Sequence, residues 1–297
     1  ARCTETGGSK FILAKWRRMI DLSDLTIVIP FYCDGIERRD NLCAIIRWFR
    51  TNTVGLDILV VENAATPQTI PLTDVRHVFS NNQNVFHRTH LLNWGMCELS
   101  TRSFVSSWDA DVLAHPQPLA SAIETLRSGA PFMLPYDGRF LDVRGSRRHV
   151  IITQGEVYSA FEAARNGDRD IVLLNANGGG GAPMFDRKRF MECGGYNERF
   201  VSWGYEDAEL VDRFARLETP YTRIDTYPLL HLSHPRGQNS STKNPNFRDN
   251  AREWARIRRL DTTQLKTEIA LGALRVSSLP KPSIAARLES RIRGFFP

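Results

Sequence analysis

Four apolar runs alternate with amphipathic segments between residues 25 and 128. The runs are predicted strands, at residues 25–29, 57–61, 76–79 and 103–108. The segments between and after them have apolar side chains at helical spacing and are predicted helices, at residues 37–51, 86–99 and 117–128. This alternation predicts an α/β fold of the Rossmann-like kind, in which a mostly parallel sheet is flanked by helices.

The pattern is less regular after residue 131. Residues 137–148 are polar and rich in glycine and arginine, so we expect an exposed loop there. A strand, two helices and a second strand are predicted further on, at residues 182–185, 186–191, 206–217 and 227–230. A polar linker and two tail helices are expected last, at residues 239–250, 252–260 and 283–296.

Charge separates the C-terminal part of the chain from the rest. Residues 241–297 hold 12 of the 39 Lys and Arg residues but only 5 of the 33 Asp and Glu residues. Because the remainder is close to neutral, we expect no nucleic-acid partner. No run of about 18 apolar residues predicts a membrane span. The five cysteines are scattered without a C-x-x-C pair, which favours a reducing, cytoplasmic compartment.

Acidic and polar side chains follow two of the predicted strands. Glu62 and Asn63 come after the second strand, and Asp109 and Asp111 come after the fourth. Ligands of such sheets bind at the carboxyl ends of strands, so we expect these side chains in one crevice. Two carboxylates one residue apart can hold Mg²⁺ or Mn²⁺, which then bridges to a nucleotide pyrophosphate. Alone, such a triplet is more often a solvated loop.

His231 and His234 follow the last predicted strand of the sheet. An imidazole nitrogen from this pair could complete the metal shell of Asp111, and a mixed Asp and His shell suits Mn²⁺ better than Mg²⁺. Taken alone, the two residues are more simply explained as surface or hydrogen-bonded histidines.

Trp203, Glu206 and Asp207 lie at the predicted start of the helix at 206–217. An aromatic ring can stack on a sugar. One carboxylate can take the proton of an acceptor hydroxyl while the other binds a hydroxyl. Helix capping explains the same two carboxylates without any ligand.

Arg88 offers a contact to phosphate, and Phe86 offers an apolar surface for a nucleoside. An exposed helix arginine and a core phenylalanine fit the spacing equally well. The glycine run at 178–181 allows close approach of the backbone to a sugar, or it is a flexible loop.

In combination, these segments resemble the β-1,4-galactosyltransferase type of GT-A glycosyltransferase, and more distantly glycosyltransferase family 2. The resemblance covers about residues 25–240. It rests on blocks in the family's order, at residues 29–42, 86–95, 109–111, 194–207 and 231–234. The second block resembles the family's F-N-R-A-K-L-L-N-V-G, the third its D-V-D, the fourth its W-G-G-E-D segment and the last its M-x-x-H.

The resemblance implies a role for each matched residue. Asp111 and His234 would be metal ligands, with Asp109 beside them and His231 in place of the family's methionine. Asp207 would be the general base, and Glu206 would bind sugar hydroxyls. The residues expected at the nucleotide sugar are Pro30, Phe31, Glu62, Asn63, Phe86, Arg88, Asp109 and Trp203, the last of which would also line the acceptor site.

The Glu206–Asp207 pair resembles inverting members of the family, because related retaining polypeptide N-acetylgalactosaminyltransferases have Asn at the second position. We therefore expect inverting transfer of galactose or an N-acetylhexosamine from a UDP-sugar, with Mn²⁺ or Mg²⁺ as cofactor. The acceptor would be a saccharide or a lipid-linked glycan, as in polysaccharide biosynthesis. Tyr205 replaces a glycine of the family pattern, which narrows the acceptor site and argues against N-acetylglucosamine as acceptor.

The same resemblance organises the chain into three parts. We expect an N-terminal extension at 1–24, a GT-A catalytic domain at 25–240 and a basic helical tail at 241–297. Residues 25–113 would form the nucleotide-binding half of the domain, and residues 114–240 the acceptor-binding half.

The predicted helix at 283–296 has apolar residues at helical spacing among arginines. One interpretation is that it rests on an anionic membrane and brings a cytoplasmic enzyme to the inner face of that membrane. The other is that it packs on the domain.

Two other functional classes fit parts of the pattern. A non-catalytic nucleotide-sugar or glycan-binding module could use the same fold, although Asp111, Asp207 and His234 together argue for catalysis. A nucleotidyltransferase would need a glycine-rich loop with Lys or Arg after the first strand, and residues 31–35 lack one.

Overall fold

A computed structural model of the chain describes residues 19–64, 74–80 and 86–276. The predicted helix at 283–296 lies outside these residues, so its contact with a membrane and the cytoplasmic location remain predictions. Within the described ranges, no helix is both long enough and apolar enough to cross a bilayer.

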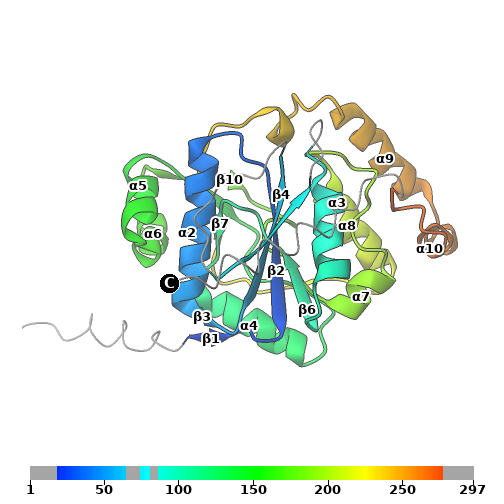
Figure 1. Ribbon diagram of the computed structural model, residues 1–297, viewed down its shortest axis with the longest axis horizontal. Coiled ribbons are helices and arrows are strands. Elements are labelled where there is room, and N and C mark those ends of the chain that lie inside the picture. Colours follow the sequence, from blue (N-terminus) through cyan, green and yellow to red (C-terminus); the bar gives the residue numbers. More distant parts are fainter. Residues whose placement is uncertain (1–18, 65–73, 81–85, 277–297) are drawn as a thin grey trace, which may run out of the picture.

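A seven-stranded sheet forms the centre of the molecule (Figure 1), in the order β12-β8-β11-β6-β2-β4-β5. Its strands are β2 (Leu25–Phe31), β4 (Asp57–Asn63), β5 (Arg76–Ser80), β6 (Phe104–Ser107), β8 (Phe132–Leu134), β11 (Met184–Asp186) and β12 (Thr222–Arg223). β11 is antiparallel to both of its neighbours, and the other pairings are parallel. The predicted α/β fold with a mostly parallel sheet is confirmed.

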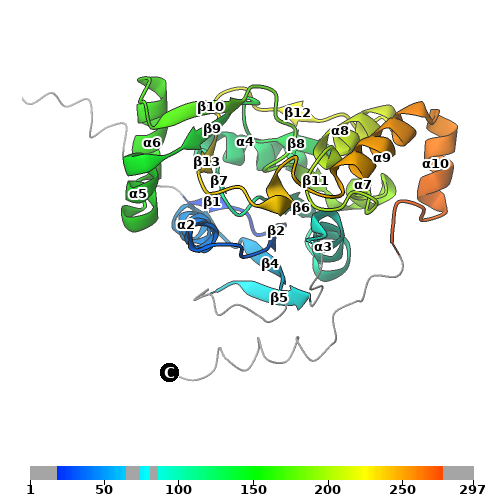
Figure 2. The ribbon, with the colours of Figure 1, turned by 90° about the horizontal axis from the view of Figure 1, so that it is seen from above.

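Helices cover both faces of this sheet. α2 (Ile36–Asn52) and α3 (Arg88–Asn93) lie on opposite sides of β2 and β4, as Figures 1 and 2 show. α3 continues as a π-helix (Trp94–Leu99), and Gly95 in it packs so closely on β2 that a Cβ would lie 2.4 Å from Cγ1 of Val28. Because both faces are covered, β2 is buried at every position, which explains its continuous apolar sequence.

Three further helices of the domain follow the predicted pattern closely. They are α4 (Pro116–Arg127), α7 (Arg187–Glu192) and α8 (Glu206–Arg216). α8 buries Leu210 and Phe214 against the sheet, as its apolar spacing predicts.

A second sheet of four strands, in the order β10-β9-β13-β7, lies beside the first. Its strands are β7 (Val112–Leu113), β9 (Phe140–Val143), β10 (Ile171–Asn175) and β13 (Leu229–Leu232). The prediction of an exposed loop at 137–148 is wrong, because this segment contains β9 and the start of α5 (Gly145–Gln154). β9 is a short apolar stretch within a polar segment, and it forms a strand held between β10 and β13.

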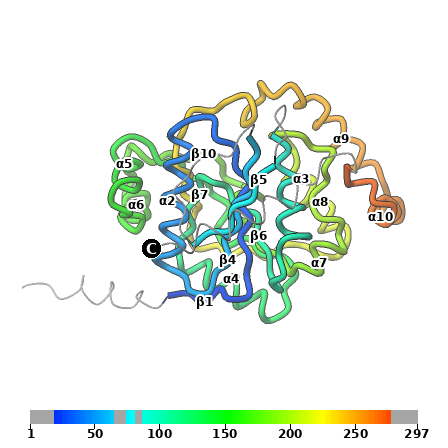
Figure 3. The backbone as a smooth tube through the Cα atoms, in the orientation of Figure 1, coloured from blue at the N-terminus to red at the C-terminus, as the bar shows by residue number. Residues whose placement is uncertain are grey.

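Two helix pairs lie at opposite ends of the long axis (Figure 3): α5 with α6 (Val157–Arg165), and α9 (Phe247–Arg259) with α10 (Thr262–Ala270). α9 is packed on the domain, since Arg216 of α8 donates a hydrogen bond to the carbonyl of Ile257 at 3.1 Å. Three short elements complete the fold, β1 (Ile20–Asp21), β3 (Thr53–Val54) and a 3₁₀ turn (Gln238–Ser240).

Candidate functional site

A cavity of about 660 Å³ lies at the carboxyl ends of β2 and β6. Most of the residues predicted from the sequence line it, namely Pro30, Phe31, Phe86, Arg88, Asp109, Asp111, Trp203, Glu206, Asp207, His231 and His234. Glu62 and Asn63 end β4, as expected, but they are not among the lining residues. The Glu62 carboxylate faces His77 instead, with 2.9 Å between Oε2 and Nε2.

The Asp109–Asp111 segment is a tight turn fixed from both sides. The buried indole of Trp108 donates a hydrogen bond to the carbonyl of Val112 at 2.8 Å, which closes the turn. The Leu232 amide donates to the carbonyl of Asp111 at 2.7 Å and joins β13 to it. This second bond brings two histidines next to Asp111. They are His231 in β13 and His234 just after it, which follow Asp111 by 120 and 123 positions in the chain.

Asp111, His231 and His234 offer three ligand atoms within 4.8 Å of one another. Nε2 of His234 lies 3.0 Å from Oδ2 of Asp111, and Nε2 of His231 lies 3.9 Å from the same oxygen. His231 is inside β13 rather than after it, and its register opposite Val112 of β7 turns its ring to this carboxylate.

The hydrogen bonds of the two imidazoles assign their tautomers. Nδ1 of His231 donates to Oδ1 of Asp142 at 2.8 Å, and Nδ1 of His234 donates to the carbonyl of Pro235 at 2.8 Å. Because Nδ1 of each ring is engaged in this way, Nε2 of each ring faces Oδ2 of Asp111. A protonated Nε2 stabilises the charge of this carboxylate, and a deprotonated Nε2 offers its lone pair to a cation. Two imidazole nitrogens and a carboxylate oxygen at this spacing are a donor set that fits a divalent metal ion.

The charge of Asp111 is stabilised although the residue is buried. Burial alone would raise the pKa of its carboxyl group, but His231, His234 and Arg38 together hold this pKa well below its usual range. Asp111 is therefore ionised across the physiological range and ready to bind a cation.

Arg88 links three carboxylates from different parts of the chain. Its guanidinium lies 2.8 Å from Oδ1 of Asp109, 3.4 Å from Oδ1 of Asp207 and 3.6 Å from Oε1 of Glu206. The predicted phosphate contact of Arg88 would therefore compete with these ion pairs. As it stands, Arg88 fixes the start of α8 against the Asp109–Asp111 turn.

Glu206 and Asp207 occupy different environments, as neighbouring positions at a helix start dictate. Glu206 is buried and accepts a hydrogen bond from the Gly204 amide at 2.7 Å. Burial raises the pKa of Glu206 to about 7, and the charge of Asp207 adds to the shift. The side chain of Asp207 is 31% exposed, against 5% for Glu206, so Asp207 is the carboxylate that an acceptor hydroxyl can reach.

Trp203 and Tyr205 form an aromatic wall with Phe247 of α9. The Trp203 and Phe247 rings are stacked at 5.8 Å, and the Tyr205 ring lies 5.3 Å from Phe247. Tyr205 has a φ of 71°, a left-handed conformation that is costly for a residue with a side chain. This backbone geometry places the ring in the cavity wall.

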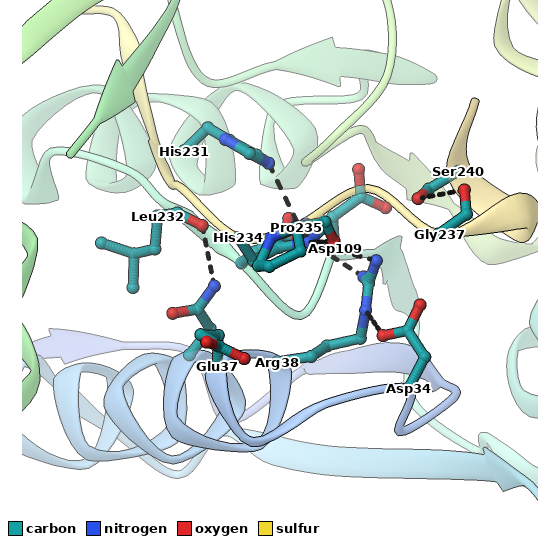
Figure 4. Close-up of polar contacts among 12 residues, drawn as sticks. Asp34, Glu37, Arg38, Asp109, His231, Leu232, His234, Pro235, Gly237 and Ser240 are labelled. Atoms are coloured by element: carbon teal, nitrogen blue, oxygen red, sulfur yellow. Dashed lines mark hydrogen bonds and ion pairs between the residues drawn. The ribbon is translucent and has the colours of Figure 1, made fainter. Parts of the chain in front are cut away.

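Several residues of the site were not predicted from the sequence, and Figure 4 shows some of them. Arg38 reaches Asp111 from the first turn of α2, and Asp34 holds Arg38. The spacing of Asp34 and Arg38, four residues apart, fits the ion pair between them, but it gives no signal for the contact of Arg38 with Asp111. Asp142 had no signal, because its segment was predicted as a loop. Other lining residues come from segments for which no site was predicted, namely Asn175, Tyr221, Arg223, Arg236 and Asn239.

The family model for the N-terminal domain of galactosyltransferase matches residues 174–235. This segment includes the glycine run, Trp203, Asp207, His231 and His234. The resemblance predicted from the sequence is thus confirmed over this part of the site. Comparison with curated proteins gives no match.

The solved structures similar to this chain include two glycosyltransferase complexes. One is the catalytic domain of Drosophila β1,4-galactosyltransferase 7 in complex with xylobiose, at 15% identity over 82% of this chain and 84% of that chain, with a TM-score of 0.48. The other is a mannosyltransferase from Pyrobaculum calidifontis in complex with GDP-Man and Mn²⁺, at 14% identity over 91% of this chain and 79% of that chain, with a TM-score of 0.46. At such identities and scores, function has to be argued from this chain's own residues.

Proposed function

We propose that the chain is a glycosyltransferase of the GT-A type, which transfers a hexose from a UDP-sugar to a saccharide hydroxyl with inversion. One observation carries the proposal: the Asp111, His231 and His234 donor set and the half-exposed carboxylate of Asp207 line the same cavity. A metal site and a partly exposed carboxylate in one cavity suit departure of a diphosphate and deprotonation of an acceptor in one step.

The donor side of the cavity combines charge and aromatic surface. Asp111, His231 and His234 would hold the divalent cation, which when bound offsets the charge that builds up on the leaving diphosphate. Tyr32 and Phe86, with ring centroids 5.8 Å apart, offer a surface for the uracil base. The mixed donor set favours Mn²⁺ over Mg²⁺.

The acceptor side centres on Asp207. The acceptor oxygen attacks the anomeric carbon as the bond from that carbon to the diphosphate oxygen breaks, and Asp207 takes the hydroxyl proton. Single displacement inverts the configuration. Glu206 is 5% exposed and accepts the hydrogen bond of the Gly204 amide, so it is suited to bind a sugar hydroxyl, while the more exposed Asp207 acts as the base.

The match of residues 174–235 to a galactosyltransferase domain supports galactose as the first donor sugar to test, followed by N-acetylhexosamines. The aromatic wall of Trp203 and Tyr205 suits the C–H face of a saccharide acceptor.

A screen of UDP-sugars with Mn²⁺, read as release of UDP, tests the proposal. We expect release with one donor, and a loss of about 10²–10⁴-fold in rate in Asp207→Ala. Asp111→Ala should lose both turnover and Mn²⁺ dependence. Unchanged release in both variants would contradict the site. Tight UDP binding without turnover of any donor would favour a non-catalytic module instead.

A further inference from the structure

Arg38 occupies a position that the mechanism above does not use. Its Nη1 atom lies 3.3 Å from Oδ2 of Asp111, the oxygen that both imidazole Nε2 atoms face. Its Nε atom donates to Oδ1 of Asp34 at 2.9 Å, which tethers the guanidinium from the start of α2. Figure 4 shows the side chain extending from α2 to this point, and it is only 16% exposed.

This contact makes Arg38 a competitor of the metal ion. A divalent cation bound to Asp111, His231 and His234 would lie about 2 Å from each ligand atom. Arg38 holds a permanent positive charge against the same oxygen, because guanidinium does not lose its proton in proteins. Two cations sharing one partly buried carboxylate oxygen repel each other strongly, so the metal binds well only when Arg38 withdraws.

A diphosphate supplies the partner that Arg38 needs in order to withdraw. The planar fork of arginine matches phosphate oxygens, and Arg38 lines the donor cavity. The tether to Asp34 keeps the guanidinium within reach of this cavity while it leaves Asp111.

We propose that Arg38 is the counter-cation of Asp111 in the metal-free protein, and that the donor diphosphate draws it away and thereby couples metal binding to donor binding. This inference rests on the proposed function, since it assumes that metal and diphosphate meet in this cavity. Coupling of this kind is reciprocal: each ligand strengthens the binding of the other by the same factor.

The full chain is titrated with Mn²⁺, with and without UDP, while the electron paramagnetic resonance signal reports free Mn²⁺. Titration of UDP alone corrects for its own binding of Mn²⁺. Arg38→Met should bind Mn²⁺ without UDP at least roughly fivefold more tightly than the unaltered chain, and UDP should then strengthen Mn²⁺ binding by a smaller factor. Arg38→Lys keeps the charge but loses the planar fork, so its Mn²⁺ affinity without UDP should lie between those of Arg38→Met and the unaltered chain. This variant replaces Arg38→Met if Arg38→Met does not fold.

Arg236→Met is the matched control, because it removes the same charge from the same cavity and no contact with Asp111 is found for Arg236 among the described residues. Its effect on Mn²⁺ binding should be clearly smaller. Equal Mn²⁺ affinity in Arg38→Met and the unaltered chain, or equal gains in Arg38→Met and Arg236→Met, would overturn the inference alone. Absence of Mn²⁺ binding in every variant, with and without UDP, would overturn the metal site and the proposed function with it.

Discussion

The carboxylate of Asp207 rests on the backbone of Gly180. A Cβ built on Gly180 would come within 2.0 Å of Oδ2 of Asp207, closer than any side-chain contact allows. Gly180 therefore supports the carboxylate of the proposed base, a role that neither sequence interpretation of the glycine run, approach to a sugar or a flexible loop, included. Tyr136 holds the backbone of Gly180 in place, because its hydroxyl donates a hydrogen bond to the carbonyl of Gly180 at 2.9 Å.

Gly180→Ala should displace the Asp207 carboxylate and lower kcat by about 10²-fold, because small misplacements of a catalytic group cost that much. Binding of UDP with Mn²⁺ should hardly change. Gly179→Ala is the control, since its added Cβ would meet only Cγ2 of Val211, at 3.1 Å. Equal kcat in both variants would show that catalysis by Asp207 does not depend on the contact of its carboxylate with Gly180.

Asp142 orients His231 through the hydrogen bond at 2.8 Å, and Arg144 holds Asp142 in turn at 2.5 Å. Although burial would raise the pKa of Asp142, His231 and Arg144 lower it to about 2. Asp142→Asn should weaken Mn²⁺ binding by about 10–100-fold, as loss of such supporting carboxylates does. Calorimetric titration with Mn²⁺ measures this. Asp137→Asn, which breaks a surface pair with Arg139 nearby in sequence, should leave Mn²⁺ affinity intact.

Stability should depend on pH through Glu206. Its pKa is raised from 4.5 to about 7, so the folded state binds this proton more tightly than the unfolded state does. A carboxyl group of this kind contributes stability at low pH, and the contribution is lost as pH rises from about 4.5 to about 7. The free energy of unfolding of Glu206→Gln, relative to the unaltered chain, should therefore increase over this range.

Urea unfolding at about pH 5 and about pH 8 checks this expectation. The surface substitution Glu192→Gln should give no such pH-dependent difference, since Glu192 is half exposed beside Arg189. A constant difference between Glu206→Gln and the unaltered chain at both pH values would contradict the raised pKa.

Tyr205→Gly should relieve the left-handed backbone at this position, a strain of roughly 1–2 kcal/mol, while it loses the contact with Phe247. We expect the two effects nearly to cancel, with a change in unfolding free energy below about 1 kcal/mol. The KM for the acceptor should change and a wider range of saccharides should react, with the KM for the donor preserved. Tyr205→Phe keeps the ring and should keep the acceptor preference. A change confined to the KM for the donor would show that Tyr205 contacts the donor and not the acceptor, which would contradict its place in the acceptor wall.

The parts of the fold that could be predicted are those in which local pattern and burial agree. β2 and β4 are buried on both faces, so their apolar runs identify them without reference to any other segment. Asp109 and Asp111 follow a strand of this kind, and the rule that ligands bind at strand ends places them correctly.

The remaining site residues depend on contacts between distant segments. β9 has only four residues within a polar segment, and it pairs with β10 and β13, which are distant in the sequence, so Asp142 was not predicted. Arg38 gains its role from a contact with Asp111, 73 residues away, which no spacing within α2 reveals. Glu62 and Asn63 show the converse case, since a strand end with suitable chemistry does not by itself place them in the cavity.

The configuration of the transferred sugar tests the central claim most directly. The reaction of an α-linked UDP-sugar with a saccharide acceptor is followed by proton NMR, with and without Mn²⁺. The account predicts a β-linked product that forms only when the metal ion is present and that disappears in Asp207→Asn. An α-linked product, or the same product at the same rate in Asp207→Asn, would contradict single displacement with Asp207 as the base.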